Sequence, residues 1–214
     1  MANFLTVFRI ILAFFTLWLL FLGKADFYIS AFFLTIIVIA LDGLDGYVAR
    51  KRNECSKLGS VLDILGDRIV ENAYWIVFSV LGWVPAWIPI LVVSRGLTTD
   101  TIRGMALAEG FTAFGDTTMM QSKLGEFLTS SRFSRAVYGA AKAFAFFIMI
   151  IAHIPKIEEY KPMTVDQFLY YINFQPTLIL IANILAYTAV VMCVVRGIPV
   201  LLESKRFFSK YDKQ

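Results

Sequence analysis

Four aspartates stand at helical spacings close together in the chain: Asp42, Asp45, Asp63 and Asp67. The first two are three residues apart and the last two are four apart, so each pair projects from one face of its own helix. Converging carboxylates in an apolar setting repel one another unless cations neutralise them. Hard divalent ions such as Mg²⁺ or Mn²⁺ suit an all-oxygen ligand set. The pattern therefore predicts a metal cage of aspartates.

A proton or cation pathway is the competing interpretation of the same aspartates, because intramembrane carboxylates are costly and by default functional. A transporter, however, is expected to carry polar positions along the whole membrane depth. The four aspartates here are instead expected to cluster at one side of the membrane. This clustering favours a bound-metal enzyme over a transporter, and a purely structural membrane protein explains none of them.

The elements that must position these aspartates are apolar runs. The 214 residues are 58% hydrophobic and 17% charged, which is too apolar for an ordinary soluble domain. Six runs are long enough to cross a lipid bilayer, at about 4–22, 28–48, 59–82, 84–108, 133–153 and 176–201. The fold class predicted is an all-α integral membrane protein, a six-helix transmembrane bundle formed by a single domain over residues 1–214.

Basic residues predict the orientation of this bundle. With the N-terminus in the cytoplasm, the cytoplasmic segments collect most of the lysines and arginines: Arg50, Lys51, Arg52, Lys57, Arg103, Lys123, Arg132, Arg135, Lys205, Arg206, Lys210 and Lys213. The opposite side receives Lys24, Lys156 and Lys161. This asymmetry follows the positive-inside rule, places both termini in the cytoplasm and opens the aspartate cage towards the cytoplasm.

Written out, the acidic stretch is Asp42-x2-Asp45-Gly46-x2-Ala49-Arg50-x8-Gly59-x3-Asp63-x3-Asp67. It resembles, at every fixed position, the signature of the CDP-alcohol phosphatidyltransferase family. The resemblance implies a divalent-metal-dependent membrane enzyme of phospholipid biosynthesis. Such an enzyme transfers a phosphatidyl-type group from a CDP-linked lipid, such as CDP-diacylglycerol, to an alcohol and releases CMP.

The resemblance also implies residue roles. Asp42, Asp45 and Asp63 are expected to bind two Mg²⁺ or Mn²⁺ ions, and Asp67 is expected to act as the catalytic base and to reach the second ion. The nucleotide pocket is expected to be lined by the other fixed positions of the signature: Gly46, Ala49, Arg50 and Gly59. Arg50 alternatively anchors the helix at the membrane interface.

A second, shorter motif lies at the N-terminus. Asn3, Thr6 and Arg9 share one helix face and resemble the opening of the family members that make phosphatidylglycerol phosphate. An arginine one or two turns inside an apolar helix needs a partner, and a donor phosphate would serve. We therefore expect Thr6 and Arg9 to bind the donor, the alternative being an arginine that snorkels to the headgroups. Glu71, one turn beyond Asp67, is expected to stay inside the bundle and to orient a cage member or Arg68.

The acceptor is the open question. A phosphorylated acceptor demands a fixed cationic pocket, and we expect Arg95, Arg132 and Arg135 to form it. Arg95 and Arg103 resemble a stretch of the phosphatidylglycerol phosphate synthases, although Gly96 replaces their usual glutamate. Glycerol 3-phosphate is the acceptor predicted first, with inositol phosphate, inositol or serine as alternatives.

The expected partners follow from this reaction. They are a CDP-linked lipid donor, a small alcohol acceptor and the surrounding membrane lipids, and no nucleic acid is expected. On the resemblance alone, a homodimer is also expected. The protein is predicted to reside in a bacterial-type inner or plasma membrane with its active site facing the cytoplasm.

Overall fold

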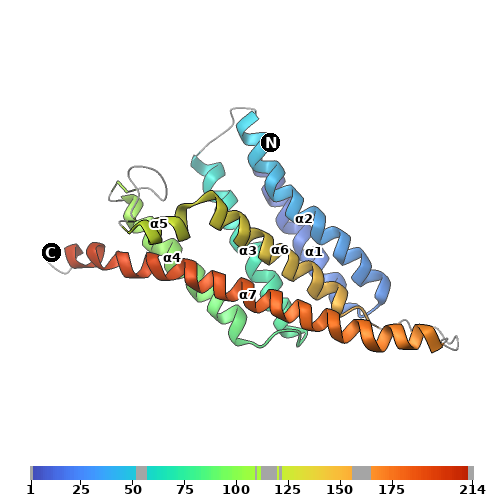
Figure 1. Cartoon of the computed structure of the whole chain (residues 1–214). Helices are drawn as coiled ribbons and strands as arrows, with labels where there is room; N and C mark the ends of the chain where they lie inside the picture. Colours follow the sequence, from blue (N-terminus) through green and yellow to red (C-terminus); the bar gives the residue numbers. More distant parts are fainter. Residues whose placement is uncertain are drawn as a thin grey trace. The chain divides into compact units, whose positions relative to one another are not determined.

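The computed structural model describes residues 2–51, 57–108, 110–111, 120, 122–155 and 165–211. This part of the chain is helical and contains no strand (Figure 1). The helices run as follows: α1 Ala2–Phe21, α2 Ala25–Lys51, α3 Lys57–Val80, α4 Trp87–Ala108, α5 Lys123–Ser130, α6 Arg132–Ala152 and α7 Val165–Tyr211.

The contacts divide the chain into two compact units. Unit 1 contains residues 1–86 and 143–184, and unit 2 contains residues 87–142 and 185–214. Each unit is described by itself below. The prediction of a single domain stays a prediction.

Unit 1 is built on α1, which packs against both α2 and α3. An aromatic cluster fills its core. The Tyr74 ring stacks on Phe146 with centroids 4.8 Å apart, and the ring of Trp75 meets the same Phe146 edge-on at 5.1 Å. The buried hydroxyls of Tyr74 and Thr35 lie 2.9 Å apart in a hydrogen bond. Because a buried hydroxyl without a partner is costly, this bond fixes the rotation of α3 against α2.

Unit 2 contains the short helix α5, which the sequence analysis did not anticipate within its polar stretch. Ser122 caps α5, because its hydroxyl accepts a hydrogen bond from the Gly125 amide at 3.0 Å. The same hydroxyl donates to Glu203 of α7 at 2.7 Å. Ser122 therefore caps the N-terminus of α5 and also links α5 to α7 through a hydrogen bond.

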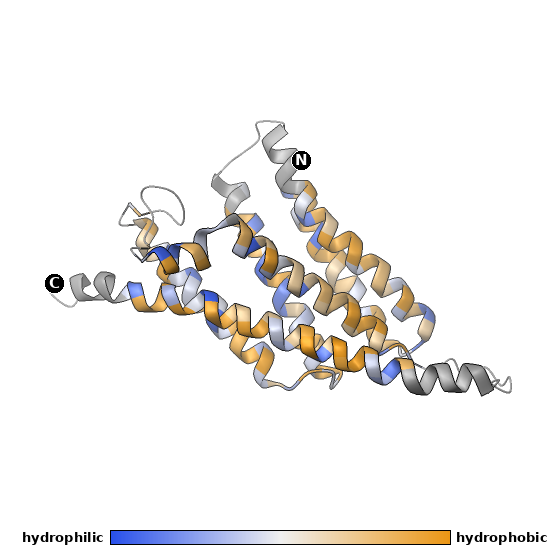
Figure 2. Cartoon of the chain, in the orientation of Figure 1, coloured by the Kyte–Doolittle hydropathy of each residue, from blue (hydrophilic) through white to orange (hydrophobic). Residues whose placement is uncertain are grey.

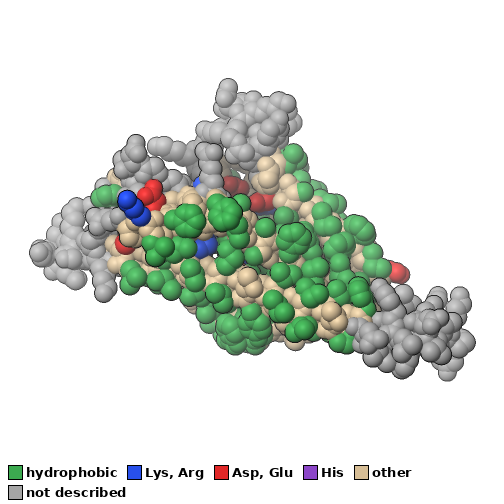
Figure 3. Space-filling model, in the orientation of Figure 1, with side chains coloured by type: hydrophobic (Ala, Val, Ile, Leu, Met, Phe, Trp, Pro, Cys, Tyr) green, Lys and Arg blue, Asp and Glu red, His purple; other side chains and the backbone are tan. Residues whose placement is uncertain are grey.

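Within the described residues, four helical stretches are long and apolar enough to cross a membrane: Asn3–Phe21, Ala25–Leu44, Phe133–Ala152 and Phe174–Ser204. Hydrophobic residues dominate these stretches, and hydrophobic side chains cover most of the described surface that faces the viewer (Figures 2 and 3). The apolar runs predicted at 59–82 and 84–108 are also helical, as α3 and α4. Their charged residues, such as Asp63, Asp67 and Arg95, keep them below the hydropathy of the other four.

The last helix extends beyond the run predicted from apolarity. The run expected at 176–201 coincides with the apolar span Phe174–Ser204. The helix α7 itself begins earlier, at Val165, because backbone hydrogen bonding continues through the more polar residues that precede the span.

Candidate active site

Three helix-face stripes in unit 1 are buried along most of their length and lead to the same cluster of more exposed carboxylates. On α1 the stripe runs through Thr6, Arg9, Ala13 and Thr16, all of them buried. The α2 stripe comprises buried Ala31, Thr35 and Val38, and continues to Asp42; the α3 stripe comprises Asp63, Asp67, Glu71, Tyr74 and Phe78. Steps of three and four residues keep each stripe on one helix face. The packing that buries Tyr74 and Phe78 thus also turns Asp63 and Asp67 towards the neighbouring helices.

The carboxylates of Asp42, Asp63 and Asp67 come together in this cluster. A carboxylate oxygen from each lies within 4.8 Å of those of the other two. Asp42 comes from α2, and the other two aspartates come from α3. Three carboxylates at this separation match the oxygen-rich ligand set that Mg²⁺ and Mn²⁺ prefer, so the donor chemistry fits a divalent cation.

Arg9 reaches the same carboxylates from α1. Its guanidinium pairs with Asp42 through Nη1, and Nη2 donates to Asp67 Oδ1 at 2.9 Å. The Arg9 side chain is only 2% exposed, whereas those of Asp42 and Asp67 are 46% and 50% exposed. The alternative of an arginine snorkelling to the headgroups is therefore wrong, since the charged end of Arg9 points into the bundle. The Nε of Arg9 is buried and has no hydrogen-bond partner in the described part of the chain.

Gly66 makes room for this arrangement. A Cβ at position 66 would lie 2.8 Å from Thr6 Cγ2 and 2.9 Å from Arg9 Nη2. Real side chains do not approach so closely, so a larger residue would displace α1 or the guanidinium. Gly66 is not one of the signature's fixed positions.

Glu71 behaves as predicted. Its side chain is buried and pairs with Arg68 of the same helix, with Nη1 and Oε2 3.5 Å apart. The pair leaves Arg68 directed along α3 and one turn away from the cluster, at an i, i+3 spacing.

Several predicted site residues cannot be placed by their side chains. Asp45, Gly46, Ala49 and Arg50 continue the backbone of α2, but their side chains lie outside the described residues. The same holds for Arg132 at the start of α6. Gly59 lies in the first turn of α3 and is half-buried.

Unit 2 contains a separate group of arginines around Arg196 of α7. Arg196 is 7% exposed; its Nη1 donates to the Ser134 hydroxyl, and its Nη2 donates to the Thr129 carbonyl at 3.4 Å. Its guanidinium lies over the Tyr138 ring, 5.4 Å from the centroid. The like charges of three further arginines act on it: Arg95, Arg103 and Arg135. The structure thus places two of the three predicted acceptor residues, Arg95 and Arg135, beside Arg196.

Sequence reasoning missed Arg196. A signal was present, because an arginine within the run "VVMCVVRGIPVLL" is costly in lipid and marks a functional position. The predicted span of 176–201 already contained it.

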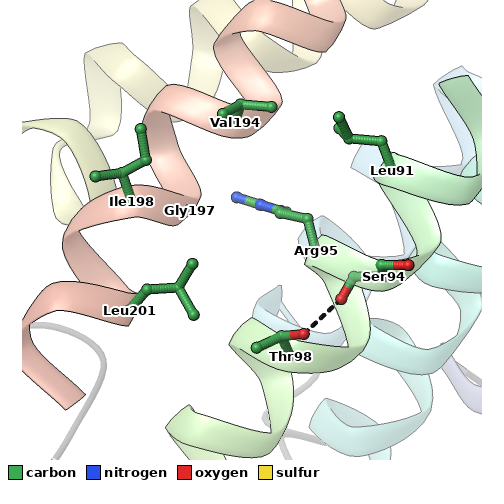
Figure 4. Close-up of a pocket in the computed structure, with 8 residues that line it drawn as sticks. All are labelled: Leu91, Ser94, Arg95, Thr98, Val194, Gly197, Ile198 and Leu201. Atoms are coloured by element: carbon green, nitrogen blue, oxygen red, sulfur yellow. Dashed lines mark hydrogen bonds between the residues drawn. The ribbon is translucent and has the colours of Figure 1, made fainter. Parts of the chain in front are cut away.

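Arg95 lies across Gly197 of α7. A Cβ on Gly197 would be 3.0 Å from Arg95 Cγ and 3.1 Å from its Nε. The absence of a side chain at position 197 therefore lets Arg95 pack directly against the backbone of α7. Both residues line an open pocket of about 320 Å³ between α4 and α7, whose other walls are mostly aliphatic (Figure 4). Arg95 points from α4 towards α7 in this pocket, and its Nε is buried without a described hydrogen-bond partner.

Comparison with known proteins defines the class of this fold and site. The family model described as CDP-alcohol phosphatidyltransferase matches residues 1–195, and the chain belongs to that family. Over 70 residues it is 36% identical to the CDP-diacylglycerol--glycerol-3-phosphate 3-phosphatidyltransferase of Bacillus subtilis (strain 168), covering 33% of this chain and 36% of that protein.

A second relative bears the same printed name, in Mycoplasma genitalium (strain ATCC 33530 / DSM 19775 / NCTC 10195 / G37). It is 29% identical over 119 residues, which covers 48% of this chain and 50% of the relative. The matched segments thus span between about a third and a half of these two curated relatives.

Proposed function

We propose that the protein is a membrane enzyme that transfers a phosphatidyl group from a CDP-linked lipid to glycerol 3-phosphate and releases CMP. The observation that carries this proposal is the convergence of Asp42, Asp63 and Asp67 at 4.8 Å, at three of the positions that the family signature fixes. Both curated relatives are named for the same donor and acceptor, which supports glycerol 3-phosphate as the acceptor.

In the proposed reaction, the acceptor hydroxyl oxygen attacks the lipid-side phosphorus of the donor pyrophosphate. The bond from that phosphorus to the CMP oxygen breaks, and CMP leaves with the electron pair. Asp67 accepts the hydroxyl proton, for which its half-exposed carboxylate is suitably open. Divalent cations, when bound, neutralise the pyrophosphate charge and the charge that develops on the leaving oxygen.

Asp42 and Asp63 hold these cations, and Asp67 also reaches the second one. We assign Asp45 to the same set because it lies one turn after Asp42. Thr6 and Arg9 face the donor from α1, and Gly46, Ala49, Arg50 and Gly59 line the nucleotide pocket. The fixed small residues allow a nucleotide to approach the backbone, and the arginines offer charge-assisted hydrogen bonds to phosphate.

For the acceptor phosphate we assign Arg95, Arg132 and Arg135, and we add Arg196. Support comes from the charge balance in unit 2: Arg196 is bound by a hydroxyl, a carbonyl and an aromatic ring, and three arginines act on it. The buried positive charge of Arg196 is stabilised by an anion, and a phosphate offers several oxygens to guanidinium groups.

The proposed enzyme crosses the membrane six times with both termini in the cytoplasm. Support comes from the four apolar spans together with α3 and α4, which occupy the two remaining predicted runs. We assign the site to the cytoplasmic side of a bacterial-type membrane, and the excess of basic residues in the predicted cytoplasmic segments supports this assignment.

The test is CMP release by the purified full chain in detergent, with CDP-diacylglycerol as donor and Mg²⁺ or Mn²⁺ present. Separate reactions receive glycerol 3-phosphate, inositol phosphate, inositol or serine. We expect release that depends on both the metal and glycerol 3-phosphate. CMP release that persists in excess chelator would refute the metal-dependent reaction, and turnover with another alcohol alone would replace the acceptor.

A further inference from the structure

The Arg9 guanidinium is bound by the same carboxylates that the proposed function assigns to metal. It pairs with Asp42 from α2 and with Asp67 from α3, and thereby spans the cluster. A cation held between those two aspartates needs the oxygens that Arg9 now engages. Arg9 and a divalent cation therefore compete for one set of ligands.

We infer that Arg9 is a tethered counter-cation that neutralises the carboxylate cluster until a divalent metal displaces it and frees it for the donor phosphates. The inference rests on the proposed function of the cluster. It assigns Arg9 two successive partners, the aspartates first and the donor anion second. Arg9 is a positioning residue in the first role and a binding residue in the second.

Burial supports the exchange. Arg9 is 2% exposed, so its charge requires an anionic partner wherever the side chain lies inside the bundle. With divalent cations at the aspartates, the positive charge of Arg9 would face like charges, and a donor pyrophosphate would supply the missing anion. The buried Nε, which has no partner among the described residues, offers one further donor for that anion.

The test measures Mn²⁺ binding to the full chain in detergent, without donor or acceptor, by titration calorimetry. For Arg9→Gln we expect Mn²⁺ binding about tenfold tighter than in the wild-type protein, because the competing charge-assisted pairs are gone. Thermal unfolding supplies a second readout. Before Mn²⁺ is added, R9Q should melt at a lower temperature than the wild-type protein. On addition of Mn²⁺, its melting temperature should rise by more than that of the wild type, because tighter binding to the folded state stabilises it more.

Arg68→Gln is the matched control. It removes an arginine next to Asp67 in sequence that pairs with Glu71. R68Q should change Mn²⁺ affinity less than R9Q, since it alters the local field without vacating a ligand. Equal tightening in both variants would overturn the inference, because a general field effect would then explain it.

Gly66→Ala displaces Arg9 without removing charge, since the added methyl would stand 2.9 Å from Nη2. It should tighten Mn²⁺ binding in the same direction as R9Q, and it serves as the second variant if R9Q does not fold. Unchanged Mn²⁺ affinity in the folded variants would refute the competition while leaving the proposed reaction intact. A wild-type protein that binds no Mn²⁺ would overturn both this inference and the metal site.

The second partner is tested with CDP, a soluble stand-in for the donor headgroup, at saturating Mn²⁺. R9Q should bind CDP about tenfold more weakly, through the lost charge-assisted hydrogen bonds. One substitution would then strengthen metal binding and weaken nucleotide binding, which a merely structural arginine would not do. Equal CDP affinity in R9Q and wild type would overturn the transfer of Arg9 to the donor.

Discussion

In unit 1 a buried arginine, Arg9, pairs with two carboxylates, whereas in unit 2 a buried arginine, Arg196, is bound by a hydroxyl, a carbonyl and an aromatic ring. Both arginines stand within helices apolar enough to cross a membrane. Arg9 balances an excess of negative charge. Arg196 adds to the positive charge of Arg95, Arg103 and Arg135.

The difference indicates what each region binds. A carboxylate cluster with an internal cation is electrostatically tolerable by itself and can exchange that cation for a metal. The buried Arg196, held by neutral groups beside further arginines, is costly until an anion arrives, so this region favours a phosphate-bearing ligand. Variants that change the charge of one region and spare the other test this division.

The largest effect is expected from Asp42→Asn. Loss of a charged ligand for the cations that stabilise the transition state should lower kcat/KM by about a thousandfold or more. CMP release at saturating Mg²⁺ measures it. Asp26→Asn, in the first turn of the same helix and far along it from Asp42, is the control and should stay near wild type. Full activity of D42N would refute the ligand assignment.

The second-largest effect is expected from Asp67→Asn, which distinguishes the role of Asp67 as general base from its role as metal ligand. As the general base, Asp67 should contribute about 10²–10⁴-fold to kcat, whereas the amide keeps a carbonyl oxygen that can still bind a cation, so donor and metal affinity should fall much less than kcat. Steady-state kinetics together with Mn²⁺ titration distinguishes the roles. Metal affinity that falls in parallel with kcat would make Asp67 chiefly a metal ligand.

Arg95→Gln and Arg196→Gln test the basic region. Each should raise the KM for glycerol 3-phosphate about tenfold or more and leave the KM for the CDP-lipid nearly unchanged, since a charge-assisted bond to phosphate is lost. Lys123→Gln, at the exposed start of α5, is the control in the same unit. If neither arginine variant alters the acceptor KM, the acceptor carries no phosphate that this cluster binds.

The smallest effect is expected from Tyr138→Leu. The Tyr138 ring lies 5.4 Å from the Arg196 guanidinium and 4.6 Å from the Lys142 ammonium. A cation–π contact at the low end of its range contributes about 0.5–1 kcal/mol, and Y138L leaves both hydrogen bonds of Arg196 in place, so it should raise the acceptor KM only severalfold. Tyr138→Phe keeps the ring and should leave the acceptor KM as in the wild type. If Y138F raises the acceptor KM as much as Y138L does, the hydroxyl and not the ring is responsible.

The sequence by itself determined the family, the helical class and the identity of the acidic cluster. Apolar runs have no alternative to a helix in lipid, because every backbone group must be paired within its own segment. The i, i+3 and i, i+4 spacings place each aspartate pair on one face whatever the neighbours are. The N-terminal spacing likewise put Thr6 and Arg9 on one face, as the buried stripe of α1 shows.

Only the tertiary structure decided which charges meet across helices. Helical periodicity gives the face of a residue but not the helix that the face packs against. Arg9 pairs with Asp42 and Asp67 through contacts between separate helices, and Gly66 leaves room for this pairing. The packing of Arg95 against Gly197 also joins two helices. The presence of α5 depended on the Ser122 cap and its contact with Glu203, which apolarity does not encode. The spacing of residues in the sequence therefore determines which side chains share a helix face, and the packing of the helices determines which side chains of other helices they contact.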